Sequence, residues 1–242
     1  MKKLFSFLFI IACGVGVFAQ SDTTKSNKKI LVVPYPSMMY FSDADADLAR
    51  FSRLDEPKLR NQMRAKLESN VYHQVSAAFD AVSLLSATSL NGEEDLKRVY
   101  AASQYYTSNA ISKNKGIFSS NLFRKKNKKQ SFYVNDSATM VGEIQDPNLQ
   151  SDLYKKHKHD YILYITQFEI NTSNKNTIEW MKQDYKRTYV MHYNLWDNKG
   201  KLVLAETLIL DAGGENNIKD ISEKYLAEMA QKLKEILRSA IK

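Results

Sequence analysis

Apolar residues recur every three to four positions in four stretches of the chain, which is the spacing of an amphipathic helix. In the clearest stretch, Asp55 or Glu56 can cap the helix, Pro57 is expected at its first helical position, and the apolar stripe continues to Phe79. The same pattern predicts three further helices, at Glu93–Ile111, Asp146–His157 and Asn217–Ile241. The inner face of the last one is expected to consist of Ile218, Ile221, Tyr225, Met229, Leu233, Ile236 and Ala240.

Short runs rich in β-branched and aromatic residues predict the strands of a sheet. Four such runs are Lys29–Tyr35, Ala81–Leu85, Ala138–Ile144 and Tyr161–Ile170. Arg187–Trp196 and Lys201–Leu210 flank Asp197–Gly200, whose composition suits a hairpin turn. We interpret Ser37–Leu54 as a loop that has room for a short helical turn. The order of elements predicts an α/β (α+β) fold, in which helices, including the C-terminal amphipathic helix, pack against a mixed β-sheet.

The amino terminus has the parts of a signal peptide. Lys2 and Lys3 give a positive start, and an apolar run extends from Leu4 to Val17. This run is too short to cross a bilayer as a helix, and compact residues precede a cleavage point after Ala19. We therefore expect three parts: a signal peptide at 1–19, a flexible leader at 20–28 and a single mixed α/β domain at 29–242.

Cys13 offers an alternative, because the residues before it fit a lipobox whose cysteine carries a lipid anchor. Val15, Val17 and Phe18 continue the apolar run past this cysteine, whereas a lipoprotein tether is polar there, so we favour ordinary cleavage. Cys13 is the only cysteine in the chain. Cleavage after Ala19 would remove disulfides, thiolate catalysis and cysteine metal sites together. The mature chain has no second long apolar run, so we expect no transmembrane span.

The formal net charge of the chain is +8, and part of this excess is local. A basic insertion is expected at about 112–135, and its cluster consists of Arg124, Lys125, Lys126, Lys128 and Lys129. Nearby aromatic residues give it the composition of a nucleic-acid surface, but an exported protein rarely meets nucleic acid. Anionic lipid or polymer surfaces are the partners that such a cluster would bind, and a solvated loop explains the same composition.

Three alternating acids, Asp43, Asp45 and Asp47, resemble the start of a calcium-binding loop. Such a loop needs glycine at its sixth position and a bidentate acid at its twelfth. Leu48 and Leu54 occupy those positions here. We therefore expect a solvated acidic loop and no calcium site.

His157 and His159 are separated by one residue and could begin a metal site. Their neighbours include Lys155, Lys156 and Lys158, whose positive charge opposes the binding of a cation. A helix end with favourable basic residues explains the same pattern. We expect no metal site here and assign no cofactor to the chain.

The Gly-x-Ser-x-Gly motif of serine hydrolases, the His-Glu-x-x-His motif of metalloproteases and the glycine-rich phosphate loop do not occur in the sequence. His73 lies in a predicted helix and His192 in a predicted strand, and we interpret both as packing or surface residues. Glu143, Glu169 and Glu206 could pair across a sheet as acid and base, although no spacing singles out a pair. We assign no catalytic residue, and an unrecognised hydrolase of envelope carbohydrate or peptide stays open as an alternative.

Four features of the sequence together resemble a known family. They are a first strand followed by a long helix, the strand HDYILYITQFEI at His159–Ile170, the hairpin YNLWDNKGKLVLAETLIL at Tyr193–Leu210, and a terminal helix. The layout resembles the periplasmic α/β domain shared by three groups: outer-membrane lipoprotein activators of peptidoglycan synthases, the soluble domain of the curli-secretion channel, and the amino-terminal domain of the Tol-system β-propeller protein. In that family Asp160-Tyr161 would begin the central strand.

This resemblance implies a scaffold that binds other envelope proteins and carries out no catalysis. We therefore hypothesise an exported, non-enzymatic cell-envelope protein at the periplasm or outer-membrane periphery of a Gram-negative-type envelope. The alternatives are the hydrolase and a binder of anionic lipid or polymer through Arg124–Lys129.

Overall fold

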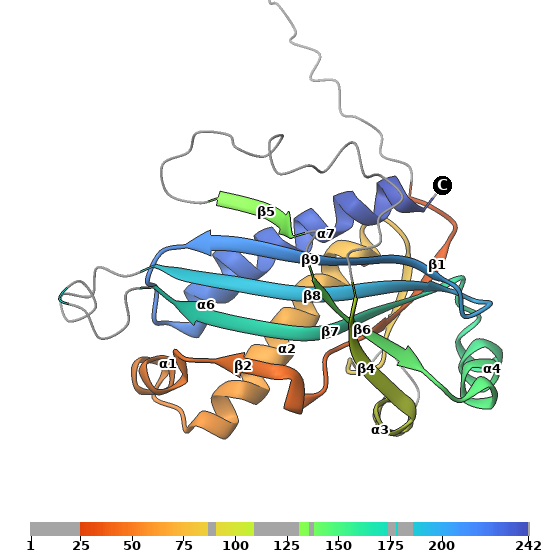
Figure 1. Cartoon of the computed structure of the whole chain (residues 1–242), viewed down its shortest axis with the longest axis horizontal. Coiled ribbons are helices and arrows are strands. Elements are labelled where there is room, and N and C mark those ends of the chain that lie inside the picture. The colour runs from red at the N-terminus through yellow and green to blue at the C-terminus, as the bar shows by residue number, and fades with distance from the viewer. Residues whose placement is uncertain are drawn as a thin grey trace, which may run out of the picture.

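The computed structural model describes residues 25–86, 91–108, 131–135, 138–173, 178 and 186–241. These residues form a mixed seven-stranded sheet in the order β3-β1-β7-β8-β9-β5, and β2 pairs with β7 further along the same edge as β1 (Figure 1). The strands are β1 (Lys29–Val33), β2 (Tyr40–Ser42), β3 (Asp80–Ser83), β5 (Ser131–Asn135), β7 (Tyr161–Thr172), β8 (Arg187–Asp197) and β9 (Leu202–Ala212). Pairs on the β3–β1–β7 side are parallel, whereas β7, β8, β9 and β5 pair antiparallel.

Strand β1 is buried on both faces, which explains why its sequence is apolar without alternation. Ile30 and Val32 contribute to one hydrophobic core, and Leu31 and Val33 contribute to a second core on the other side of the sheet. The strand therefore lies between two packed layers, as the apolar run at Lys29–Tyr35 predicted.

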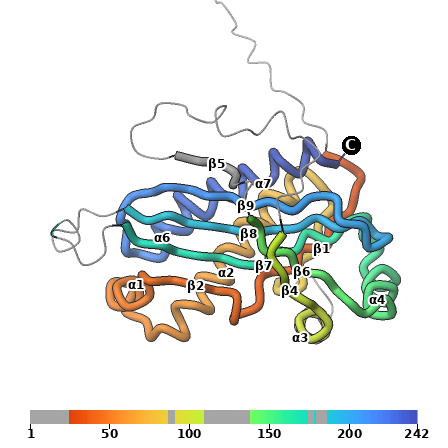
Figure 2. The backbone as a smooth tube through the Cα atoms, in the orientation of Figure 1, coloured from red at the N-terminus to blue at the C-terminus, as the bar shows by residue number. Residues whose placement is uncertain are grey.

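Two long helices cover the first face of the sheet and pack against each other (Figure 2). One is α2 (Glu56–Ser76), and the other runs through 218–240 as α6 (Ile218–Ile221), the π-helical turn η2 (Ser222–Leu226) and α7 (Ala227–Ala240). Asp55 caps α2, because its carboxylate accepts a hydrogen bond of 2.8 Å from the Lys58 amide. The predicted stripe of α2 is fully buried at Leu59, Met63, Leu67, Val71 and Val75.

The second face carries α3 (Gly92–Ala102), α4 (Pro147–His157) and a two-stranded antiparallel ribbon of β4 (Ser103–Ser108) and β6 (Thr139–Ile144). Strand β6 contacts β7, β8 and β9 in turn, so it crosses the sheet and does not join its hydrogen-bonded edge. In Figure 1 this ribbon lies in front of the sheet, and α2 and α7 lie behind it. The predicted mixed sheet with packed helices is thus confirmed.

Two sequence predictions of local structure are wrong. Residues 37–54 are not a loop, since they contain the 3-10 helix η1 (Ser37–Met39), strand β2 and helix α1 (Asp45–Ser52). The helix predicted from Glu93 ends at Ala102, and β4 follows it. The aromatic and hydroxyl side chains of β4 favour an extended strand, and pairing with β6 provides the partner that the isolated segment lacks.

Several sequence predictions fall on residues outside the described ranges. They include the signal peptide at 1–19, Cys13, the cluster Arg124–Lys129, and all of the insertion at 112–135 except β5. Among the described residues, no helix is both long enough and apolar enough to cross a bilayer.

Candidate functional site

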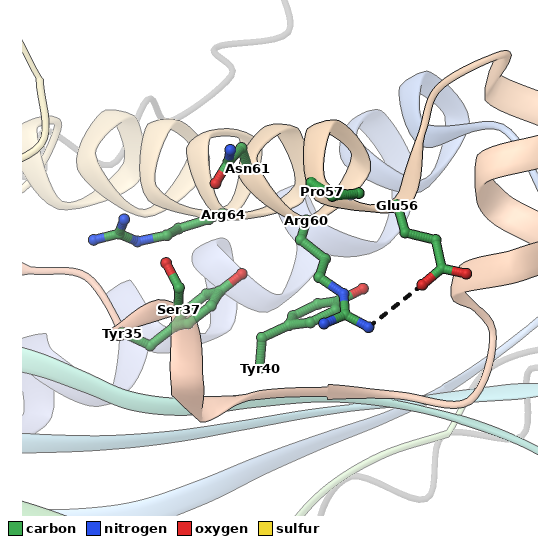
Figure 3. Close-up of a pocket in the computed structure, with 8 residues that line it drawn as sticks. All are labelled: Tyr35, Ser37, Tyr40, Glu56, Pro57, Arg60, Asn61 and Arg64. Carbon is green, nitrogen blue, oxygen red and sulfur yellow. Dashed lines mark ion pairs between the residues drawn. The ribbon is translucent and has the colours of Figure 1, made fainter.

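A pocket of about 300 Å³ lies between the first half of α2 and the segment that links β1 to β2 (Figure 3). Its volume is at the lower end of the range found for small-ligand sites. It is lined by Tyr35, Ser37, Tyr40, Glu56, Pro57, Arg60, Asn61 and Arg64. We call it the arginine–tyrosine pocket.

Local sequence explains how the two walls of the pocket form. Pro34 and Pro36 flank Tyr35 and end β1, because proline cannot continue the hydrogen-bonded ladder. Arg60 and Arg64 are four residues apart, so both leave α2 on the side that faces the tyrosines (Figure 3). Neither arginine was among the residues predicted from the sequence, although their spacing beside the apolar stripe of α2 indicates that they share one side of the helix.

The floor of the pocket is aromatic. Tyr35 and Tyr40 stack on each other with ring centroids 6.2 Å apart, and both stack on Phe168 of β7. Tyr35 is only 1% exposed, so its ring is fixed by the core while the residue contributes to the lining of the pocket. A rigid aromatic floor holds the polar groups above it in place.

Arg60 is already neutralised by acidic partners. Its Nε lies 2.6 Å from Asp45 Oδ2, and one terminal nitrogen lies 3.6 Å from a Glu56 oxygen. Asp45 also accepts a hydrogen bond of 2.8 Å from the Tyr40 hydroxyl. The hydrogen bond to Asp45 raises the pKa of Arg60, and burial raises the pKa of Tyr40, so the first stays charged and the second stays protonated.

Arg64 differs, because it has no ion pair among the described residues. One terminal nitrogen donates to the Tyr100 hydroxyl, which in turn donates to the carbonyl of Pro34 at 2.7 Å. The Arg64 Nε is buried and, within the described ranges, has no hydrogen-bond partner, and the same holds for the Tyr35 hydroxyl. Burial raises the pKa of Tyr35, so this hydroxyl stays a donor. Unpaired buried donors each cost about 1–3 kcal/mol, which makes two of them beside one pocket notable.

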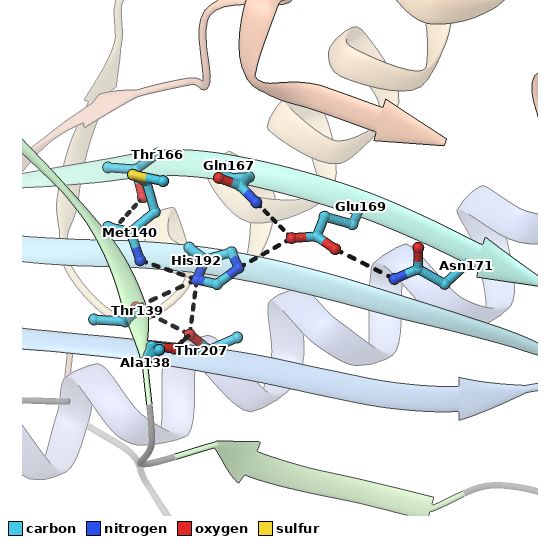
Figure 4. Close-up of polar contacts among 9 residues, drawn as sticks. All are labelled: Ala138, Thr139, Met140, Thr166, Gln167, Glu169, Asn171, His192 and Thr207. Carbon is cyan, nitrogen blue, oxygen red and sulfur yellow. Dashed lines mark hydrogen bonds and ion pairs between the residues drawn. The ribbon is translucent and has the colours of Figure 1, made fainter. Parts of the chain in front are cut away.

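A second polar cluster lies where β6 crosses the sheet (Figure 4). His192 Nδ1 accepts a hydrogen bond of 3.1 Å from the Met140 amide and lies 2.8 Å from Thr207 Oγ1. An accepting Nδ1 places the ring proton on Nε2, which lies 3.3 Å from Glu169 Oε1. The hydrogen bond from His192 is the main cause that lowers the pKa of Glu169.

The other side chains of this cluster also bind the backbone of β6. Asn194 accepts from the Gly142 amide at 2.7 Å and donates to the Met140 carbonyl at 3.3 Å. Thr166 donates to the same Met140 carbonyl at 2.7 Å, and the Trp196 indole donates to the Gly142 carbonyl at 3.1 Å. The cluster therefore supplies hydrogen bonds to backbone groups of β6 that are not paired with β4.

The arrangement of hydroxyl, imidazole and carboxylate resembles a nucleophile with its base, but access to the hydroxyl is closed. Thr207 on β9 and Thr139 at the start of β6 are each 1% exposed. A nucleophile must be reachable by substrate, so the geometry favours the packing role that the sequence indicated for His192. His73 is exposed on α2 and also has no nucleophile beside it among the described contacts.

The carboxylates considered for acid–base catalysis have separate partners. Glu206 accepts a hydrogen bond of 2.8 Å from Tyr193 in the core. Glu143 lies 3.4 Å from the Tyr106 hydroxyl, and Glu169 belongs to the histidine cluster. These contacts lead to different partners, and among the described residues the arginine–tyrosine pocket is lined by one carboxylate, that of Glu56.

The acids Asp43, Asp45 and Asp47 do not converge. Asp43 accepts from the Thr172 amide at 2.9 Å, and Asp47 pairs with Arg50 at 2.9 Å. Asp45 is only 5% exposed, so the expectation of a solvated acidic loop is wrong at this position. Its burial is possible because the Tyr40 and Arg60 side chains satisfy it.

The two neighbouring histidines also point to different partners. His157 Nε2 lies 3.0 Å from Asp95 Oδ2, which also lies 2.6 Å from Lys156 Nζ. His159 is buried against the ring of Tyr154, and burial lowers its pKa from 6.5 to about 4. Across the described ranges, no three His, Cys, Asp or Glu side chains are grouped as a metal site would require. The basic cluster Arg124–Lys129 lies outside those ranges, and its binding role stays a prediction.

No protein-family model matches the sequence, and no curated protein matches it at a significant level. Among solved structures, a leucine-to-methionine variant of the PelC dodecamer from Paraburkholderia phytofirmans is similar, with a TM-score of 0.38, 9% identity, and coverage of 86% of this chain and 89% of that one. Another PelC dodecamer from the same organism gives a TM-score of 0.36 and 8% identity, with coverage of 88% and 91%. The Evf virulence factor gives a TM-score of 0.18 and 9% identity, with coverage of 88% and 80%. The resemblance to the periplasmic α/β family stays a prediction.

Proposed function

We propose that the mature chain is a non-enzymatic binding protein of a Gram-negative-type cell envelope, and that it recognises another envelope protein through the arginine–tyrosine pocket and the surface beside it. The observation that carries this proposal is a pair of buried donors, Arg64 Nε and Tyr35 Oη, which have no partner among the described residues and belong to two residues that line the pocket. Groups of this kind are satisfied when a ligand supplies an acceptor.

The surface next to the pocket supports a protein partner. Ser37 and Tyr40 line the pocket, and the residues that follow them in sequence, Met38 and Phe41, are 76% and 50% exposed. Methionine and phenylalanine are enriched in the buried centres of protein interfaces. Export, which the signal-peptide pattern predicts, would bring this surface into contact with envelope proteins.

The lining of the pocket favours binding over catalysis. Apart from the tyrosines, the hydroxyl in the lining is that of Ser37. Among the described residues, no histidine lines the pocket that could act as a base for this hydroxyl. Its two cations are guanidinium groups, which do not exchange protons near neutral pH.

Photocrosslinking in intact cells tests this proposal. A photoreactive amino acid placed at Met38 or Phe41 is expected to yield a reproducible adduct with an envelope protein, identified by mass spectrometry. The matched control is the same amino acid at Lys199, an exposed position in the β8–β9 turn. Adducts that are absent at both test positions, or equally strong at Lys199, would refute the proposal.

A further inference from the structure

We infer that the arginine–tyrosine pocket receives one carboxylate group, held between the guanidinium of Arg64 and the hydroxyl of Tyr35. This inference rests on the proposed function and names the chemistry by which that site would recognise its partner. It follows from the unused donors, the charge balance and the walls of the pocket.

The unused donors fit two acceptor oxygens. Arg64 Nε–H and Tyr35 O–H are both buried, and neither has a partner among the described residues. One terminal nitrogen of Arg64 donates to the Tyr100 hydroxyl, which in turn donates to the Pro34 carbonyl, so the guanidinium is anchored before a ligand binds. A carboxylate offers one oxygen to each donor, and guanidinium–carboxylate hydrogen bonds are among the strongest in proteins.

The charge balance selects a single negative charge. Asp45 and Glu56 already neutralise Arg60. Glu68 lies one turn beyond Arg64 on α2, but it is not part of the lining and forms no ion pair with Arg64 in the described structure. Arg64 is thus the lining cation that has no ion pair among the described residues, and the single charge of a carboxylate matches it, whereas a phosphate dianion exceeds it.

The remaining walls suit an apolar group attached to the carboxylate. Pro57 and the rings of Tyr35 and Tyr40 line the pocket, and its volume of about 300 Å³ admits a side chain beside the acid. A peptide that ends in an apolar residue combines both features. Because the proposed partner is a protein, the carboxyl end of a polypeptide is the source to which we assign the carboxylate.

Binding to the purified mature chain tests the inference, with amide NMR shifts as the readout. The probes are N-acetylphenylalanine, its uncharged C-terminal amide, and phenyl phosphate. We expect the carboxylate to bind in the millimolar range and at least about tenfold more tightly than the amide, since one charge-assisted pair is worth about that factor. Shifts should centre on α2 and residues 35–40. Equal binding of acid and amide, tighter binding of phenyl phosphate, or no shifts at about 10 mM probe would overturn the inference.

Three variants complete the test. Arg64→Gln should weaken the binding of N-acetylphenylalanine about tenfold, so that the acid no longer binds more tightly than the amide. Tyr35→Phe should weaken the binding of N-acetylphenylalanine severalfold without loss of stability, because the hydroxyl that it removes has no partner among the described residues. The control is Arg50→Gln, which removes an exposed arginine on α1 that is paired with Asp47. Loss of binding in the control, or full binding in Arg64→Gln, contradicts the assignment.

The two proposals can fail separately. If crosslinks form at Met38 or Phe41 and persist in Arg64→Gln, the recognition face stands and the carboxylate assignment is refuted. If N-acetylphenylalanine binds as expected but no crosslink forms, the preference of the pocket for a carboxylate stands, and both the protein partner and the polypeptide source of the carboxylate are refuted.

Discussion

Replacement of Asn194 by alanine should loosen the ribbon of β4 and β6 from the sheet. The side chain is fully buried, and its oxygen accepts a hydrogen bond of 2.7 Å from the Gly142 amide. Alanine leaves that buried N–H without a partner, which costs about 1–3 kcal/mol. The second bond of Asn194, to the Met140 carbonyl at 3.3 Å, adds little because Thr166 still donates to that oxygen at 2.7 Å.

The space left by the missing amide adds a cavity contribution of about 1 kcal/mol, so the free energy of unfolding should fall by about 2–3 kcal/mol in total. Urea denaturation followed by circular dichroism measures this change. With a slope of about 2–3 kcal/mol per molar urea, the midpoint should fall by about 1 M, with the slope unchanged. Hydrogen exchange should show that the Gly142 amide loses protection at the same time.

The control for this experiment is Asn198→Ala in the β8–β9 turn, where the side chain is exposed and forms no hydrogen bond with the described residues. It should change the free energy of unfolding by less than about 0.5 kcal/mol. If Asn194→Ala shifts the midpoint no more than this control, the hydrogen bonds from the sheet do not hold β6 in place, and the role assigned to the polar cluster is wrong.

Three further perturbations test other parts of the structure. Gly142→Ala should lower the free energy of unfolding by about 1–3 kcal/mol in urea titrations, because the new Cβ would lie 2.9 Å from Thr166 Cγ2, and a neutral result contradicts the close packing. Asp55→Ala should lower it by about 1 kcal/mol through loss of the cap on the Lys58 amide, and far-ultraviolet dichroism would report the fraying of α2. Burial lowers the pKa of His159 from 6.5 to about 4, so the unfolded chain takes up this proton first as the pH falls. The free energy of unfolding should therefore be unaffected by His159 above pH 6.5 and should fall by up to about 1.4 kcal/mol per pH unit towards pH 4. His159→Phe should flatten this slope, and an unchanged slope would remove His159 as its cause.

Elements that depend on local pattern were predictable from the sequence. The cap at Asp55, the apolar stripe of α2, the strand at Tyr161–Ile170 and the hairpin turn at Asp197–Gly200 are all present as predicted. Each is defined by residues that are close together in the chain, and each has its own turn or cap chemistry.

Elements that depend on distant contacts were not predictable. Strand β4 exists because β6, which follows it after a long interval of sequence, supplies its only described ladder. From the sequence Asp45 was predicted to be a solvated acid, but in the structure it accepts hydrogen bonds from Tyr40 and Arg60. The arginine–tyrosine pocket has the same origin, since Tyr35 follows a strand and Arg64 lies deep inside a helix, and only the packing of α2 on the sheet brings them together. Periodicity indicates which face of a helix is buried, but it does not identify the groups at the border of that face.

Helix α2 serves two purposes with adjacent residues. Arg60 directly follows the fully buried Leu59, and Arg64 directly follows the fully buried Met63. The helix cannot rotate about its axis or slide along the sheet without disturbing its core stripe, so the guanidinium groups inherit their positions from the hydrophobic core. A ligand would meet a preorganised site and would lose little affinity to the ordering of side chains. Selectivity at such a site should come from shape and from the placement of charge, and substitutions in the core beneath α2 should alter it without touching the ligand.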